Sequence, residues 1–208
     1  MDEKTLSCVD CAVRSCDSEN GMYPDFCLTA KLTEEEIRQI KDIYKEPENH
    51  ETMCAAAAVE MEGYLKECRV EEIINFARKM GMKKLGIATC VGLLRESRTL
   101  AKILRSHGFE VYGAACKVGA IPKIEVGIDK ECEAVGVNMC NPIMQAKLLN
   151  EAGTELNLVM GLCVGHDSLF YKYSEALSTT VVTKDRVLGH NPVAALYTAE
   201  SYYKKLLK

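Results

Sequence analysis

The chain has 208 residues, of which 48% are hydrophobic and 27% are charged, so it carries enough apolar material for a core and is too short for a large multidomain assembly. Its formal net charge of -4, with no block of Lys and Arg, argues against nucleic-acid binding through phosphates. The first residues are polar and acidic, and no apolar run approaches the length that a membrane-spanning helix needs. We therefore expect a cytoplasmic protein with no membrane or nucleic-acid partner.

Residues 1–30 are rich in cysteine and are predicted to bind metal. Cys8, Cys11, Cys16 and Cys27 lie among turn-forming residues without apolar periodicity, so this segment cannot build a core unaided. Four thiols complete a four-thiolate zinc site or hold a cubane iron–sulfur cluster, and metal binding supplies folding free energy. The spacing of these four cysteines does not distinguish a zinc site from an iron–sulfur cluster. A disulfide framework is the less favoured alternative in a reducing compartment.

Residues 31–80 are predicted to be helical. Thr33 and Glu36 form the capping-box pattern that opens a helix, and this helix should end before Pro47. Further helices are expected over 51–68 and 70–80. We expect this region to pack on the main domain that follows it.

From residue 82, short apolar runs alternate with helical patterns. Strands are expected at 85–89, 109–115, 134–139, 156–162 and 179–183, and helices at 93–106, from 142, at 168–177 and at 193–207. Such alternation implies right-handed crossovers and a parallel sheet with helices on both faces. The predicted fold class is therefore α/β, with a Rossmann-like domain over 81–208. No glycine fingerprint for a dinucleotide or a nucleotide phosphate is present.

Four further cysteines are each predicted to follow a strand. They are Cys90, Cys116, Cys140 and Cys163. The carboxyl ends of parallel strands meet at one edge of the sheet, where ligands bind and helix N-termini point their N–H groups. Soft thiolates gathered there favour iron–sulfur clusters, zinc or copper(I), and we predict a shared cofactor site, foremost a [4Fe–4S] cluster. Metal-free thiol chemistry and plain packing of small apolar residues are the alternatives.

Polar residues at the same predicted edge are candidates for catalysis. They are His166, Asp167, Lys184, Arg186 and His190, with Lys117, Asn141 and Gln145 beside them. A histidine can serve as general acid or base near neutral pH, and lysine or arginine can bind an anionic substrate. The competing interpretation is structural, because an aspartate can cap a helix, a charged turn can be solvated, and a histidine can be satisfied within the fold.

Several of these motifs together resemble one protein family. They are Gly86-Ile87-Ala88-Thr89-Cys90-Val91-Gly92-Leu93, Cys116-Lys117-Val118-Gly119, Cys140-Asn141-Pro142-Ile143, Gly161-Leu162-Cys163-Val164-Gly165-His166-Asp167 and Lys184-Asp185-Arg186-Val187-Leu188-Gly189-His190-Asn191-Pro192. In this order, they are similar to the prokaryotic domain-of-unknown-function 1847 family of predicted metal-binding proteins. The resemblance covers nearly the whole chain, including the amino-terminal cysteines, and implies metal binding by cysteine without naming a substrate or reaction.

Two hypotheses of function follow from these expectations. In the first, three of the four dispersed cysteines hold a [4Fe–4S] cluster and leave one iron open to a small-molecule substrate, with removal or transfer of sulfur as the favoured reaction. In the second, both thiolate sets are fully coordinated, and the protein passes electrons or metal to a redox partner without catalysis. The sequence leaves open which three cysteines ligate, and whether the chain oligomerises.

Overall fold

The computed structural model describes residues 6–18 and 21–207 of the chain. The chain divides into two compact units, Met1–Ala57 and Ala58–Lys208. The boundary falls inside helix α3 (Pro47–Gly63), so the last helix of the predicted 31–80 region belongs with the sheet. The three-part division into 1–30, 31–80 and 81–208 stays a prediction.

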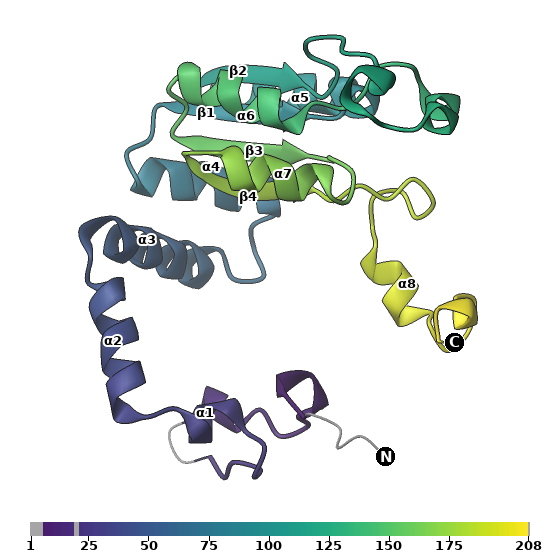
Figure 1. Ribbon diagram of the computed structural model, residues 1–208. Helices are drawn as coiled ribbons and strands as arrows, with labels where there is room; N and C mark the ends of the chain where they lie inside the picture. The colour runs from purple at the N-terminus through teal and green to yellow at the C-terminus, as the bar shows by residue number, and fades with distance from the viewer. Residues whose placement is uncertain (1–5, 19–20, 208) are drawn as a thin grey trace. The chain divides into compact units, whose positions relative to one another are not determined.

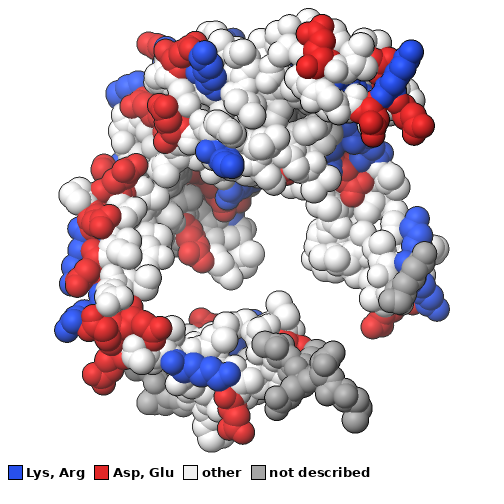
Figure 2. Space-filling view, in the orientation of Figure 1, with Lys and Arg blue, Asp and Glu red and all other residues white. Residues whose placement is uncertain are grey.

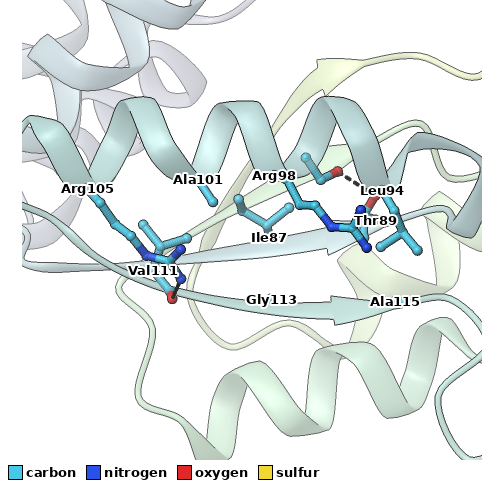
Figure 3. Close-up of a pocket in the computed structure, with 10 residues that line it drawn as sticks. Ile87, Thr89, Leu94, Arg98, Ala101, Arg105, Val111, Gly113 and Ala115 are labelled. Carbon is cyan, nitrogen blue, oxygen red and sulfur yellow. Dashed lines mark hydrogen bonds between the residues drawn. The ribbon is translucent and has the colours of Figure 1, made fainter.

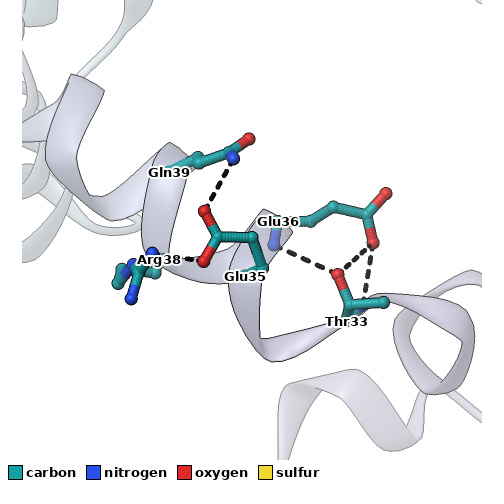
Figure 4. Close-up of polar contacts among 5 residues, drawn as sticks. All are labelled: Thr33, Glu35, Glu36, Arg38 and Gln39. Carbon is teal, nitrogen blue, oxygen red and sulfur yellow. Dashed lines mark hydrogen bonds and ion pairs between the residues drawn. The ribbon is translucent and has the colours of Figure 1, made fainter.

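The first unit is built from short helical elements. Two 3-10 helices, Cys8–Asp10 and Ser15–Asp17, are followed by α1 (Leu28–Lys31), α2 (Glu34–Tyr44) and the start of α3. The capping box that opens α2 is confirmed: the Thr33 hydroxyl accepts a hydrogen bond from the Glu36 N–H at 3.2 Å, and Glu36 accepts one from the Thr33 N–H at 2.8 Å (Figure 4). Glu35 pairs with Arg38 and accepts a hydrogen bond from Gln39. The side chains of Thr33 and Glu36 thus supply hydrogen-bond acceptors for free backbone N–H groups at the amino-terminal end of α2.

The second unit contains a four-stranded parallel sheet. Its strands are β1 (Lys84–Thr89), β2 (Glu110–Ala115), β3 (Leu156–Met160) and β4 (Leu177–Val182), in the order β2-β1-β3-β4 (Figure 1). Every residue of β3 is buried, as a central parallel strand requires. The chain moves outward from β1 to β2 in one direction and from β3 to β4 in the other. The strand order therefore reverses between β1 and β3, which is where open α/β sheets bind ligands.

Helices cover both faces of this sheet (Figure 1). On one face lie α4 (Arg69–Lys79) and α5 (Leu94–Ser106), which contribute the core residues Ile73, Ile74, Ala77, Leu100 and Leu104. On the other face lie α6 (Pro142–Glu151) and α7 (His166–Tyr173), which contribute Ala146, Leu149 and Phe170. The predicted α/β class, a parallel sheet with helices on both faces, is thereby confirmed.

The strand predicted at 134–139 is wrong. This stretch belongs to the long connection between β2 and α6, where Gly136 takes a φ of 114° that ends a 3-10 helix, Lys130–Val135. An isolated antiparallel bridge joins Asn138 to Pro122. Four apolar residues around a glycine with positive φ do not continue as a strand, so Cys140 follows an irregular loop and not a strand.

Three predicted helices have different bounds in the structure. The helix expected from 51 begins at Pro47, because proline fits the first turn of a helix, and the helix expected from 168 begins at His166. The final helix, α8 (Val193–Tyr197), ends well before residue 207. There the Thr198 hydroxyl donates to the Ala194 carbonyl at 2.7 Å, a local bond that competes with further helix.

Charged side chains are spread over the surface. Lys and Arg are interspersed with Asp and Glu on the face shown in Figure 2, as expected for a chain with a small negative net charge. Within the described part of the chain, none of the helices has the length and apolar character needed to span a membrane.

Candidate metal centre

Cys90 and Cys116 directly follow β1 and β2 at the same edge of the sheet. The Cys90 N–H donates to the Met160 carbonyl at 3.1 Å, and the Cys116 N–H donates to the Thr89 carbonyl at 2.8 Å. The hydrogen bonds of the sheet therefore continue through both cysteines. The two residues are 8% and 2% exposed, so the sheet backbone holds two thiols in buried positions.

Gln145 of α6 joins the ends of the same two strands. It is fully buried, and its Nε2 donates to the Thr89 carbonyl at 3.1 Å and to the Ala114 carbonyl at 2.7 Å. Thr89 immediately precedes Cys90, and Ala114 lies two residues before Cys116. These bonds give Gln145 a positioning role for the two cysteines.

Cys140 reaches the site through the loop that connects β2 to α6. The next residue, Asn141, donates its N–H to the Cys116 carbonyl at 2.7 Å, which returns the loop to the end of β2. The Asn141 side chain also donates to the Val118 carbonyl at 3.3 Å and accepts the Met144 N–H at 3.1 Å, which caps α6. Asn141 therefore caps α6 with its side chain, and its backbone N–H bond to Cys116 brings Cys140 beside Cys116.

The thiols of Cys90, Cys116 and Cys140 interact with one another. Cys116 lies between the other two, and hydrogen bonds to Cys140 and Cys90 raise its pKa, so it keeps its proton. Interaction with Cys116 lowers the pKa of Cys90 and of Cys140, so negative charge is favoured on these two sulfurs while the single Cys116 S–H donates to one of them at a time. The Val91 and Gly92 N–H groups donate at 3.4 Å to the Sγ atoms of Cys116 and Cys90, respectively. Thiols from three separate segments thus converge at one edge of the sheet.

Cationic side chains face these thiols. The Cys140 thiolate hydrogen-bonds to His166 at the start of α7 and raises the pKa of that histidine. Lys117 adds positive charge near Cys140, and Lys184, which follows β4, adds positive charge near Cys90; both lysines lower the pKa of the cysteine that they face. The site therefore favours negative charge on sulfur.

Gly161 makes room for Leu93 beside the end of β3, and the sequence analysis missed this role. Gly161 follows β3 with a φ of 64°, and a Cβ there would lie 2.2 Å from Leu93 Cδ1 and 3.5 Å from Lys184 Nζ. Only glycine combines this backbone conformation with the close approach of Leu93, whereas Lys184 lies at an ordinary contact distance. The available signal was a glycine directly after a buried strand and two residues before a cysteine.

Cys163, the fourth dispersed cysteine, has a different partner. Arg186 Nη2 donates to Cys163 Sγ at 3.0 Å, and this bond raises the pKa of Arg186. The negative charges of Cys90 and Cys140 also help to raise the pKa of Arg186. Cys163 is half-buried and lies near this set, where it is held by an arginine.

The remaining two predicted catalytic residues bond to the backbone of turns. Asp167 accepts the Ser168 N–H at 2.8 Å at the start of α7. His190 Nδ1 accepts the Asp185 N–H at 3.1 Å, and Asp185 in turn accepts the Val187 N–H at 2.9 Å. These contacts lie in the turn after β4 and in the first turn of α7, and the catalytic roles of Asp167 and His190 stay predictions.

The four amino-terminal cysteines line one cavity in the first unit, beside Tyr23 and Phe26. This cavity, of about 120 Å³, is bordered by Cys8, Cys11, Cys16 and Cys27. All eleven cysteines of the chain are free thiols. Over residues 6–18 and 21–207, no three Cys, His, Asp or Glu side chains are arranged as a single metal ion requires. Both cysteine groups thus consist of neighbouring thiols without a formed ligand shell for one ion.

Sequence comparison identifies the family. A profile described as "Protein of unknown function (DUF1847)" matches residues 27–181. The chain belongs to this family. It is also 49% identical over 183 residues to the uncharacterized protein MJ0455 of Methanocaldococcus jannaschii, a match that covers 88% of this chain and 94% of that protein. The region matched by the family profile contains the four dispersed cysteines and Cys27, while Cys8, Cys11 and Cys16 precede it.

One solved structure with partial similarity is the crystal structure of Dph2 from Pyrococcus horikoshii with a 4Fe-4S cluster. It is 20% identical to this chain, and the match covers 67% of this chain and 33% of that one, with a TM-score of 0.35. The match thus spans about a third of the length of Dph2. A likeness of this size establishes neither a shared fold nor a shared cofactor.

Proposed function

We propose that Cys90, Cys116 and Cys140 bind a [4Fe–4S] cluster, and that the protein is an enzyme that removes or transfers sulfur on a small anionic molecule. The observation that carries this proposal is the mutual contact of three thiols from separate segments at the carboxyl edge of a parallel sheet. Soft thiolate donors, nearby cations and N–H groups that donate to sulfur are the environment in which such clusters are held.

A cubane cluster can be held by this donor set. In a cluster each thiolate binds its own iron, so the three sulfurs need not meet at one atom. Cys163 is left outside the ligand set, because its hydrogen bond is to Arg186.

The residues around the thiols suggest how a substrate would be handled. When bound through three thiolates, a cluster has one iron that is open to substrate as a Lewis acid. Arg186 and Lys184 can bind an anionic group. The Cys140 thiolate raises the pKa of His166, which favours the protonated form and suits this histidine to deliver a proton to departing sulfur. Cys163 supplies a free thiol next to this position, and the catalytic roles of Asp167 and His190 stay predictions.

We also propose a separate structural metal site at the four amino-terminal cysteines. Its support is that all four side chains border one cavity in a segment with little apolar core of its own. Zinc is the simplest occupant, because four thiolates close its tetrahedral shell and tie the segment together. A closed iron–sulfur cluster is the alternative, and metal analysis of a Cys8→Ser, Cys11→Ser variant tells the two apart: loss of zinc supports zinc, and loss of iron and sulfide supports a cluster.

Catalysis is tested by sulfide release. Anaerobically purified full-length protein is incubated with a panel of small thiol-bearing carboxylates, and wild type is compared with His166→Gln. We expect the variant to keep its iron and acid-labile sulfide and to lose at least tenfold in rate, since general acid catalysis contributes about 10²-fold or more. A cluster-bearing protein that releases no sulfide from the panel would instead support electron transfer or metal handling. An unchanged rate in His166→Gln would rule out the role given to this histidine.

A further inference from the structure

A groove separate from the cysteine site lies on the other face of the sheet. It has a volume of about 270 Å³ and runs between α5 and the edge strand β2 (Figure 3). Its floor is made by Ile87, Val111 and Gly113, and its wall on α5 includes Leu94 and Ala101. The thiols belong to the face covered by α6 and α7, whereas this groove belongs to the face covered by α5.

The charged residues of the groove are all cationic. Arg98 and Arg105 lie seven residues apart on α5, about 10 Å along the helix axis, and both extend over the groove (Figure 3). Arg105 Nη2 donates to the Val111 carbonyl at 3.1 Å, which fixes this side chain at one end. Among the described residues Arg98 has no hydrogen bond or ion pair, and the ten lining residues include no acidic side chain. A guanidinium without a partner, above an apolar floor, is complementary to an anion.

The groove has open space above β2 because Gly113, which lines its floor, has no side chain. A Cβ on Gly113 would meet the Ile87 carbonyl oxygen at 3.6 Å and Ile87 Cβ at 3.8 Å, which is ordinary contact, so a side chain is tolerated here by the backbone. The glycine therefore serves no conformational need, and its effect is to leave space above β2. At the end of the groove near the strand carboxyl ends, Thr89 and Ser97 hydrogen-bond to each other at 2.6 Å and close it.

We propose that this groove binds a small organic anion, whose apolar body lies on Ile87 and Gly113 and whose carboxylate or phosphate group is bound by Arg98. The groove is somewhat smaller than sites that bury drug-sized ligands, so the ligand is a compact molecule. This site is independent of the proposed cluster, and its ligand chemistry is that of a carboxylate or phosphate monoester with a short apolar tail.

The test is calorimetric titration of the full chain with two probes, hexanoate and phenyl phosphate, which separate the carboxylate from the phosphate source. Arg98→Gln removes the proposed anion partner, and Gly113→Leu fills the groove without changing charge. Arg95→Gln is the matched control, because Arg95 is an exposed arginine on the same helix that does not line the groove. Circular dichroism checks that each variant folds.

We expect one probe to bind at millimolar concentration or better, with at least tenfold weaker binding in Arg98→Gln and in Gly113→Leu and no change in Arg95→Gln. Loss of one charge-assisted hydrogen bond accounts for a change of this size. The proposal is overturned if neither probe binds at millimolar concentration. Equal weakening in Arg98→Gln and Arg95→Gln would also overturn it, because the effect would then be one of net charge.

Discussion

Replacement of Gln145 by methionine tests whether this residue holds the two strand ends together. Methionine has nearly the same length but removes the two hydrogen bonds to the carbonyls of Thr89 and Ala114. Each buried bond contributes about 1 kcal/mol, so their loss costs about 2 kcal/mol. Gln145 Oε1 is buried and has no hydrogen-bond partner among the described residues. Its replacement by an apolar group removes the free-energy cost of this unpaired oxygen and offsets part of the loss of about 2 kcal/mol. We expect the free energy of unfolding to fall by about 1–2 kcal/mol.

The assay is urea unfolding followed by circular dichroism at neutral pH, in which this loss lowers the midpoint by about 0.5–1 M. Gln145→Glu is the companion variant, because a carboxylate at this fully buried position faces two carbonyl oxygens. It should be less stable than Gln145→Met at neutral pH. Burial raises the pKa of the new carboxyl group, so the folded state of Gln145→Glu regains stability as the pH falls. A Gln145→Met midpoint equal to that of wild type would refute the positioning role.

Two further changes test the packing and the electrostatics of the second unit. Gly86→Ala should destabilise the protein by about 1–3 kcal/mol in the same urea assay, because its Cβ would lie 2.0 Å from the side-chain oxygen of buried Asn157. Gly113→Ala, whose Cβ has room, is its control, and equal midpoints for the two variants would contradict this reasoning. Lys184→Met should raise the pKa of Cys90 in metal-free protein, since an ammonium that favours the thiolate is lost. Alkylation of Cys90, followed by peptide mass spectrometry across pH, should then shift to higher pH, and an unchanged profile would exclude this contact.

The fold was largely predictable because its signals are local. Short apolar runs mark β1 to β4, and the alternation of strands and helices indicates a parallel sheet. The same logic places Cys90 and Cys116 together, since both directly follow neighbouring strands. Helix ends were less predictable, and α8 ended early because Thr198 makes a local side-chain bond that competes with the helix.

The position of Cys140 was predicted for a reason that proved wrong. No strand precedes it in the structure; instead, the Asn141 N–H bonds the Cys116 carbonyl and closes a loop of more than twenty residues. Such a contact depends on tertiary structure and leaves no periodic pattern in the sequence. The pairing of Cys163 with Arg186 has the same origin, because it depends on where Arg186 lies after β4.

The most direct test of the proposed centre is the iron and acid-labile sulfide content of four single variants, each purified without oxygen. Cys90→Ser, Cys116→Ser and Cys140→Ser should each lose iron and sulfide relative to wild type, because each removes one of the three proposed ligands. Cys163→Ser should keep both, since Arg186 and not the cluster is the partner of this thiol. Wild-type protein without iron, or an equal loss in Cys163→Ser and the other three variants, would contradict a cluster held by these three cysteines.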